Sequence, residues 1–142
     1  MERILEILQD SSQTTPEQIS VMLGIPVNEV KRAIKQAEQE KIILKYKTII
    51  NWDKAGRKEA LALIEVKVMP QRNVGFDSIA DRIYQFPQVY SAYLVSGTYD
   101  LALLVKGENM QEIASFVSEK LAPMEQVQST VTHFLLKRYK ED

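Results

Sequence analysis

Apolar positions follow two different periods along the chain, and the change occurs near residue 46. Before that point they recur at three- and four-residue intervals, which is the spacing of one face of an α-helix. After it they form short runs rich in β-branched and aromatic residues, which is typical of strands. The helical apolar positions of the first part are Ile4, Leu5, Leu8, Ile19, Met22, Leu23, Val30, Ile34 and Ala37. The pattern therefore predicts a helical first part and a second part built on a sheet.

The second part alternates strand-like runs with helical patterns in a recognisable order. The runs are residues 61–68, 89–95, 101–105 and 127–136, and helical patterns at residues 76–83 and 110–121 follow the first and third of them. The order strand, helix, strand, strand, helix, strand is that of the ferredoxin-like βαββαβ fold, a four-stranded antiparallel sheet with both helices on one face. We therefore predict an α+β chain with a ferredoxin-like effector and oligomerisation domain over residues 59–142. Residues 46–58 are predicted to be a linker that includes a β-strand.

The first part carries a tightly connected pair of helices. Thr15 and Gln18 have the spacing of a capping box, with a proline at the first helical position between them. The tripeptide Gly24-Ile25-Pro26 supplies a stop for this helix and a start for the next. Together with a first helix at residues 2–10, this is the tri-helical pattern of a (winged) helix-turn-helix DNA-binding domain, expected over residues 1–45.

The third predicted helix, residues 27–40, has a polar outer face because Val30, Ile34 and Ala37 form its inward stripe. Residues 27–47 hold six Lys or Arg against three Glu, and such side chains match phosphates and base edges. Any exposed helix has a polar face, but the capped helix and short turn before this one favour DNA binding. The side chains predicted to contact DNA are Asn28, Glu29, Lys31, Arg32, Lys35, Gln36 and Gln39.

Several motifs are similar, in the same order, to those of one known family. They are Gly24-Ile25-Pro26, then Val30-x-Arg32-x-Ile34-x-x-x-Glu38-x-x-x-Ile42-Ile43, then Tyr46-x-x-Ile49-Ile50-Asn51, and finally Val95-Ser96-Gly97-Thr98-Tyr99-Asp100 followed by the strand-like run at 101–105. On this set the chain resembles the leucine-responsive regulator/asparagine regulator (Lrp/AsnC) family over nearly its whole length.

The resemblance implies a transcription regulator that binds double-stranded DNA and controls genes of amino-acid metabolism. In that family dimers commonly assemble into tetramers, octamers or larger rings, and a small molecule, often an amino acid, binds between effector domains. By motif position Arg32 would contact DNA. The effector loop would be Gly97, Thr98, Tyr99 and Asp100.

Three positions depart from the family pattern. Pro26 stands where a serine is usual at the start of the third helix, so a hydroxyl that contacts phosphate is missing. Ala33 replaces one of two paired arginines, and Lys41 replaces a glycine after the helix. A lysine is the costlier residue if the helix ends in a left-handed cap. These departures concern the strength of DNA binding rather than the fold.

The predicted sheet needs a partner, because its strands are apolar on both faces while two helices can cover only one. Leu104 in the third strand and Leu94 in the second are both expected on the uncovered face. A second copy of the same sheet, related by a two-fold axis, is the closure we expect. The chain is therefore predicted to form a homodimer.

The segment from Gly97 to Asp100 has two interpretations. It lies between two predicted strands, and Gly and Asp are common in plain hairpin turns. As an effector loop, its backbone amides would receive a ligand carboxylate and Asp100 would accept the ligand's ammonium group. The residues themselves leave both interpretations open.

Composition limits the classes of function that remain. The formal net charge is −1, so any basic surface is local, and no apolar run approaches the roughly 18 residues of a membrane helix. With no Cys, one His and five Gly, no nucleophile–base pair, metal cluster or phosphate-cradling loop is recognisable. We therefore expect a cytoplasmic protein with no catalytic site, no metal and no cofactor, although ferredoxin-like domains also occur in enzymes.

Two alternatives to an effector-responsive regulator stay open on the sequence. One is an architectural protein that wraps or bridges DNA without an effector. The other is an amino-acid-sensing oligomeric module with weak DNA binding, which the departures at Pro26 and Ala33 suggest.

Two features flanking the predicted sheet receive structural interpretations. Trp52 is expected to anchor the linker rather than to stack on a base. The tail Lys137-Arg138-Tyr139-Lys140 is basic enough to suggest phosphate contact, but we interpret it as a solvated strand end.

Overall fold

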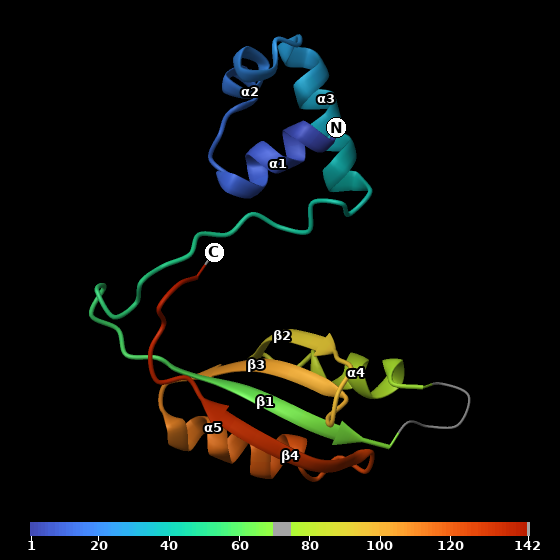
Figure 1. The fold of residues 1–142 in the computed structure, drawn as a ribbon, viewed down its shortest axis with the longest axis vertical. Coiled ribbons are helices and arrows are strands. Elements are labelled where there is room, and N and C mark those ends of the chain that lie inside the picture. Colours follow the sequence, from blue (N-terminus) through green and yellow to red (C-terminus); the bar gives the residue numbers. More distant parts are fainter. Residues whose placement is uncertain (70–74, 142) are drawn as a thin grey trace. The chain divides into compact units, whose positions relative to one another are not determined.

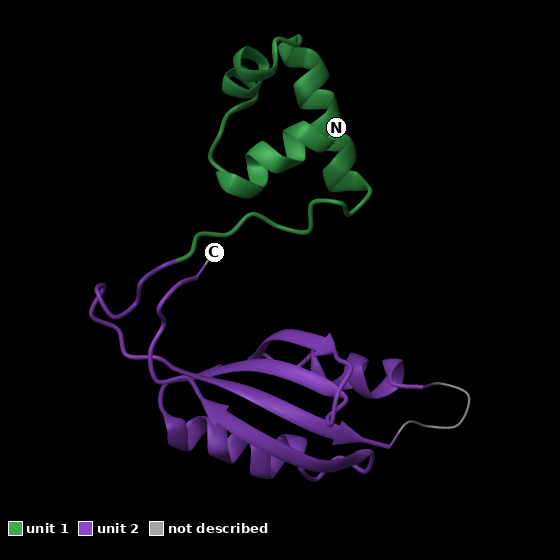
Figure 2. Cartoon of the chain, viewed as in Figure 1, with its two compact units in different colours: residues 1–49 green, residues 50–142 purple. Residues whose placement is uncertain are grey.

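The computed structural model describes residues 1–69 and 75–141, and the chain divides into two compact units. One unit is residues 1–49 and the other is residues 50–142 (Figure 2). Three helices make up the first unit, and a sheet with its helices makes up the second (Figure 1). Each unit has an apolar core of its own. Within the described part of the chain, no helix is long and apolar enough to cross a membrane.

The first unit packs α1 (Glu2–Asp10), α2 (Pro16–Leu23) and α3 (Val27–Gln39) around a small core. The buried members of that core are Ile4, Leu8, Ile19 and Val30. These are positions that the helical period directs inward. The predicted tri-helical arrangement is confirmed.

The predicted capping box of α2 forms. Thr15 Oγ1 accepts the backbone N–H of Gln18 at 3.2 Å, and the Gln18 side-chain oxygen accepts the N–H of Thr15 at 2.8 Å. Helix α2 ends at Leu23 and is capped by Gly24, whose φ of +67° lies in the left-handed region that glycine adopts without steric cost. The chain therefore turns sharply into α3.

The end of α3 adopts the left-handed cap at a lysine. Among the described residues Lys41, with φ of +59°, is the one non-glycine residue with positive φ. That conformation costs a residue with a Cβ about 1–2 kcal/mol. It is held by the N–H groups of Ile42 and Ile43, which both donate to the carbonyl of Ala37 at 2.9 and 3.0 Å.

The linker contains no strand, which differs from the sequence expectation for residues 46–58. A strand needs a neighbour for its backbone N–H and C=O groups, and no other described segment pairs with this one. Residues 51–57 instead form a compact turn. In it Ala55 N–H donates to the carbonyl of Asn51 at 3.1 Å, and Arg57 N–H donates to that of Trp52 at 2.9 Å.

The second unit is built on four strands, β1 (Ala60–Val68), β2 (Val89–Leu94), β3 (Leu101–Gly107) and β4 (Val127–Phe134). All neighbouring pairs are antiparallel, and the spatial order is β2-β3-β1-β4. The first and third strands of the sequence therefore lie in the centre. This is the ferredoxin-like topology, so the predicted α+β class and βαββαβ order are confirmed.

One face of the sheet is closed by the helices. These are α4 (Asp77–Ile83) and α5 (Met110–Phe116), which continues as a π-helical segment η1 (Val117–Leu121). Both share a single core with alternate residues of the strands, and Phe86 meets Phe116 edge-on with ring centroids 5.4 Å apart. The fully buried side chains include Ile64, Val66, Ile83, Leu103, Val105 and Leu121.

A bulge in β2 changes which of its side chains face the helices. From Val89 to Ser91 the chain advances two residues while its partner β3 advances only one. Beyond the bulge Leu94 is paired with the buried Leu101, so it lies on the helix side of the sheet. The expectation that Leu94 lies on the open face is therefore wrong. Leu104 lies on the open face as expected, because its neighbours along β3 point into the core.

Candidate DNA-binding face and effector loop

The outer face of α3 carries all seven side chains predicted to contact DNA. Each of the seven is exposed, whereas Val30 and Ala37 on the opposite side are fully buried. Four of them follow the spacing i, i+4, i+7, i+11 and so form one stripe along the helix. These four, here called the α3 stripe, are Asn28, Arg32, Lys35 and Gln39. No ion pair or side-chain hydrogen bond among the described residues engages any of them.

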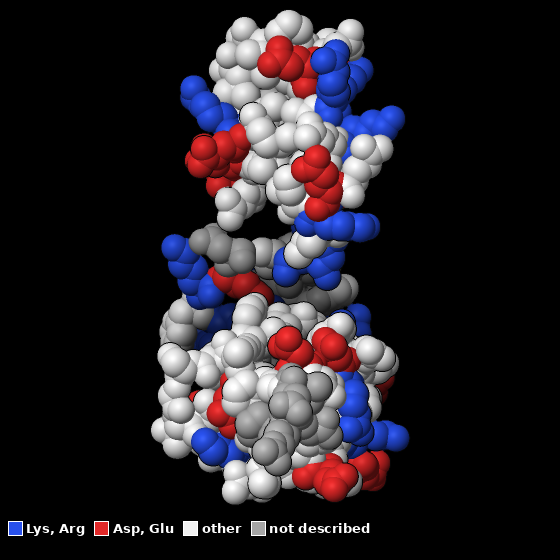
Figure 3. Space-filling model, turned by 90° about the vertical axis from the view of Figure 1, so that its right-hand side faces the viewer, with Lys and Arg blue, Asp and Glu red and all other residues white. Residues whose placement is uncertain are grey.

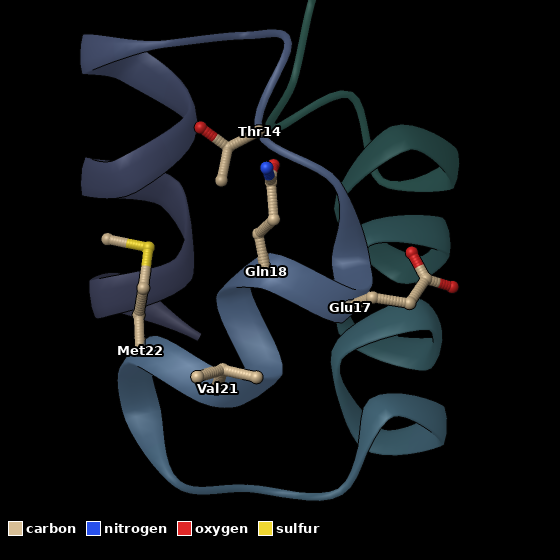
Figure 4. Close-up of a pocket in the computed structure, with 5 residues that line it drawn as sticks. All are labelled: Thr14, Glu17, Gln18, Val21 and Met22. Carbon is tan, nitrogen blue, oxygen red and sulfur yellow. The ribbon is translucent and has the colours of Figure 1, made fainter.

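Two of the other predicted DNA contacts are engaged within the first unit. Lys31 Nζ lies 3.4 Å from Glu17 Oε1, and Gln36 Nε2 donates to Glu40 Oε1 at 2.8 Å. Glu17 extends from α2 on the side that faces α3 (Figure 4). A hydrogen bond from its own backbone N–H, followed by Lys31, lowers the pKa of Glu17. Both partners are mostly solvent-exposed, so such a pair is easily exchanged for a phosphate contact.

A contact that the sequence did not predict holds the start of the linker to α3. The hydroxyl of Tyr46 donates to Glu38 Oε1 at 2.8 Å. Burial and this hydrogen bond raise the pKa of Tyr46, so the phenol remains a donor. Both residues belong to the motifs of the family resemblance, but their contact depends on how the chain turns after α3.

An open hollow of about 610 Å³ lies on the outer surface of α2, and Figure 4 shows the residues that line it. Two of them are apolar and largely exposed, Val21 at 84% and Met22 at 61%. None of the seven side chains predicted to contact DNA lines this hollow. The apolar surface of α2 is therefore distinct from the polar face of α3.

Charges of both signs are interspersed over the face of the protein that Figure 3 shows. Residues 1–49 contain seven Lys or Arg and seven Asp or Glu. The basic character of α3 therefore comes from arrangement rather than from the total charge. Arg32 and Lys35 lie one turn apart on the α3 stripe, without a paired acid among the described residues.

The predicted effector residues Gly97, Thr98, Tyr99 and Asp100 lie in the loop that joins β2 to β3. The loop is closed by the N–H of Val95, which donates to the carbonyl of Asp100 at 2.9 Å. Gly97 has φ of +147°, a conformation that other residues rarely adopt. The backbone N–H groups of residues 96–99 donate to no acceptor within the described chain. The loop thus presents a run of unused donors.

Asp100 is partly occupied inside the protein. Its Oδ2 accepts the backbone N–H of Val68 at 2.9 Å and lies 3.8 Å from Lys67 Nζ. Lys67 in turn donates to the carbonyl of Thr98 at 3.1 Å. The carboxylate therefore ties the loop to the end of β1, and Oδ1 is its oxygen without such a contact. Sequence reasoning missed Lys67, because the β1–β3 register that brings it to Asp100 is not visible along the chain.

The open face of the sheet has an apolar centre. Leu63 on β1 is paired with Leu104 on β3 and with His133 on β4. His133 Nε2 lies 3.3 Å from Glu65 Oε2 across the strands. Helices cover the other face only, so these half-exposed apolar side chains have no cover within the described chain.

Family models match both units of the chain. The model for the Lrp/AsnC ligand binding domain matches residues 61–142, and a model for winged helix-turn-helix DNA-binding matches residues 2–43. The chain is also 51% identical over 140 residues to the helix-turn-helix-type transcriptional regulator YugG of Bacillus subtilis, covering 98% of this chain and 84% of that protein. The chain belongs to the Lrp/AsnC family.

Solved structures share the fold of this Lrp/AsnC protein. A transcriptional regulator of Neisseria meningitidis, in complex with L-methionine, superposes with a TM-score of 0.77 at 23% identity, covering 97% of this chain and 88% of that one. The feast or famine regulatory protein of Mycobacterium tuberculosis, also with L-methionine, gives 0.77 at 19% identity, covering 98% and 91%. Family membership makes this chain a DNA-binding transcription regulator with a ligand-binding domain, in a family of regulators rather than enzymes.

Proposed function

We propose that this Lrp/AsnC protein binds a specific DNA sequence through α3 and responds to an amino acid, or a related small metabolite, at the loop of residues 97–100. The observation that carries the proposal is the α3 stripe, whose side chains have no partner among the described residues. Their donors and acceptors are available to DNA without the loss of any internal contact. A polar stripe on the third helix of a helix-turn-helix is positioned for the major groove.

The side chains of the stripe suit base readout. The Arg32 guanidinium matches the two acceptors of guanine, and the amides of Asn28 and Gln39 match adenine. Lys35 adds a contact to guanine or phosphate. Each good bidentate pair contributes about 1–3 kcal/mol of discrimination between bases. Glu29 would accept a hydrogen bond from cytosine, while Lys31 and Gln36 would exchange their present acidic partners for phosphates or base edges.

The effector half of the proposal rests on the unused donors of the loop. The N–H groups of residues 96–99 would receive a carboxylate, as a run of free amides does in many anion sites. Oδ1 of Asp100 would accept the ammonium group, because Oδ2 already accepts the N–H of Val68. A ligand bound in this way competes with Lys67 for Asp100, which couples the ligand to the end of β1.

Dimerisation through the open sheet face completes the proposal. Two copies related by a two-fold axis would bury Leu63 and Leu104 of each against the other. A dimer presents two α3 helices, so half-sites should lie on one face of the duplex, separated by whole helical turns. Further assembly of dimers to tetramers or octamers would join more half-sites.

Sequencing of the genomic fragments bound by the purified protein, with and without each amino acid, tests the proposal. The expected result is a set of fragments with a shared, two-fold symmetric motif, whose occupancy changes with one or a few amino acids. Binding without sequence preference or amino-acid response would instead identify an architectural protein. Amino-acid binding without DNA binding would identify a sensing module.

A further inference from the structure

Two basic segments of the second unit, far apart in sequence, leave the sheet at the same end. Residues 51–59 lead into β1, and residues 135–141 follow β4 (Figure 1). The N–H of Leu135, just after β4, donates to the carbonyl of Leu61 in β1 at 2.9 Å, so the two segments leave the sheet from neighbouring strands. Burial raises the pKa of Tyr90, and charges from both segments, Glu141 and Arg138 on one and Glu59 on the other, act on it. The two segments therefore share one neighbourhood.

The net charge of these two segments has the opposite sign to that of the rest of the second unit. Residues 50–59 and 135–142 together contain six Lys or Arg against four Asp or Glu, whereas residues 60–134 contain five against eight. Glu141 is paired with Arg138 at 3.1 Å, which leaves five cations against three acids outside this pair. The six cationic side chains, here called the basic end, all belong to exposed residues: Lys54, Arg57, Lys58, Lys137, Arg138 and Lys140.

Part of the basic end is held in place. Asn51 Oδ1 accepts the N–H of Lys54 at 3.1 Å, which closes the turn that carries Arg57. The Arg57 guanidinium lies 4.9 Å from the centre of the Trp52 ring, a cation–π contact. The Trp52 ring therefore orients a cation of the basic end. An ordered cation loses less conformational entropy on binding a phosphate than a mobile one.

We propose that the basic end binds the phosphate backbone of the same DNA duplex that α3 reads. This inference rests on the proposed DNA-binding function. Lys54 lies fifteen positions after Gln39, the end of α3, and that length of chain spans at most about 50 Å. The basic end is therefore tethered within reach of a duplex held by α3, and that duplex carries one negative charge per roughly 1.7 Å of its axis. The contact adds affinity without reading sequence. In this proposal the tail at residues 137–140 contacts phosphate instead of being only a solvated strand end.

The salt dependence of binding to a mixed-sequence duplex tests the inference in the full-length protein. Neutralising two cations of the basic end, in Arg57→Gln with Lys58→Gln, should make the negative slope of log K against log salt shallower, by about 0.9 per lost contact. The same is expected for Lys137→Gln with Lys140→Gln. The matched control is Arg82→Gln with Lys120→Gln, which removes the same charge from exposed residues elsewhere on the second unit. It also removes the hydrogen bond of 3.2 Å from Arg82 to Gln126 Oε1, at the other end of the sheet, and should leave the slope as in the parent. Equal slopes for the basic-end variants and the control would overturn the inference.

A local readout separates this inference from the proposed function. Trp52 is the only tryptophan of the sequence and lies against Arg57, so its fluorescence reports directly on the basic end. DNA should change the emission of the parent, and much less that of the Arg57→Gln, Lys58→Gln variant under conditions where it still binds. If the parent binds DNA with unchanged Trp52 emission, the basic end is not in contact and only this inference fails. If the parent binds no DNA at all, the proposed function fails first.

Discussion

The two candidate sites differ in how far their polar groups are already used inside the protein. On α3, the side chains Asn28, Arg32, Lys35 and Gln39 have no partner among the described residues. In the loop after β2, Asp100 binds Val68 N–H at 2.9 Å and lies 3.8 Å from Lys67. The first site can receive DNA without internal rearrangement, whereas a ligand at the second has to share or displace existing contacts. That difference suits a DNA-recognition surface at the α3 stripe and a ligand-responsive element at the loop after β2.

The sheet repeats the same contrast between its two faces. On the helix side, Leu103 and Val105 are fully buried in a closed core. On the open side, Leu63 and Leu104 meet each other but no covering layer in the described chain. A substitution on an unengaged surface should therefore change association and leave folding intact. A substitution of an engaged group should change stability as well.

The largest effect is expected on the α3 stripe. Replacing Arg32 and Lys35 together with Ala should weaken binding to specific DNA by roughly a hundredfold or more at matched salt, because each lost base or phosphate contact is worth about 1–3 kcal/mol. Fluorescence anisotropy of a labelled duplex measures this. The free energy of unfolding should change by less than about 0.5 kcal/mol, because neither side chain has an internal contact.

Arg3→Ala is the control for that pair, since Arg3 is an exposed cation of α1 in the same unit. It should leave specific binding nearly as in the parent. Undiminished binding by the Arg32, Lys35 double variant, or equal losses in the control, would mean that the reading surface lies elsewhere.

The next effect concerns the open face of the sheet. Leu104→Asp should raise the dimer dissociation constant by on the order of tenfold to a hundredfold, because an unpaired carboxylate would be buried between the two sheets. Leu94→Asp should leave the dimer intact, because the bulge turns Leu94 to the helix side, where it is 63% exposed. Analytical ultracentrifugation of both variants measures the difference. Equal dissociation by the two variants, or a monomeric parent at micromolar concentration, would contradict the assignment of the interface.

An intermediate effect is expected at Asp100, the engaged group of the loop. Asp100→Ala should lower the free energy of unfolding by about 1 kcal/mol, because the part-buried N–H of Val68 loses its acceptor. It should also remove the response of DNA binding to the amino acid. Chemical denaturation and calorimetry with the responsive amino acid measure the two effects separately.

Two further variants separate the structural role of Asp100 from its role in ligand binding. Asp100→Asn keeps an oxygen for the Val68 N–H but loses the charge, so stability should recover while ligand affinity stays low. Lys67→Met removes the cation that lies 3.8 Å from the carboxylate and should raise ligand affinity several-fold. Ligand binding by Asp100→Asn equal to that of the parent would leave Asp100 as a tie between the loop and β1 only.

The sequence predicts features that depend on local periodicity and leaves open those that depend on how strands pair. Exposure of Arg32 and burial of Val30 follow from a helical period that is local, so α3 could be interpreted residue by residue. The strand order followed from the order of elements and from the antiparallel topology they favour. The Leu94 side chain was assigned to the wrong face because the bulge in β2 shifts its alternation by one residue. The Lys67–Asp100 contact joins two strands and depends on their register, which pattern along one strand does not contain.

The smallest effect concerns Lys41, the residue at which the first unit uses an unfavourable backbone conformation. Its φ of +59° costs a residue with a Cβ about 1–2 kcal/mol, and glycine removes most of that cost while adding entropy to the unfolded chain. Lys41→Gly should therefore raise the free energy of unfolding of the first unit by up to about 1 kcal/mol. Lys41→Gln removes the same charge but keeps the Cβ, and should leave stability near that of the parent. Thermal unfolding of both variants measures the difference, and specific DNA binding should change equally in the two, because the strain lies in the cap and not in the α3 stripe. A stabilised Lys41→Gln, or a destabilised Lys41→Gly, would show that charge or local order rather than backbone strain decides stability at this cap.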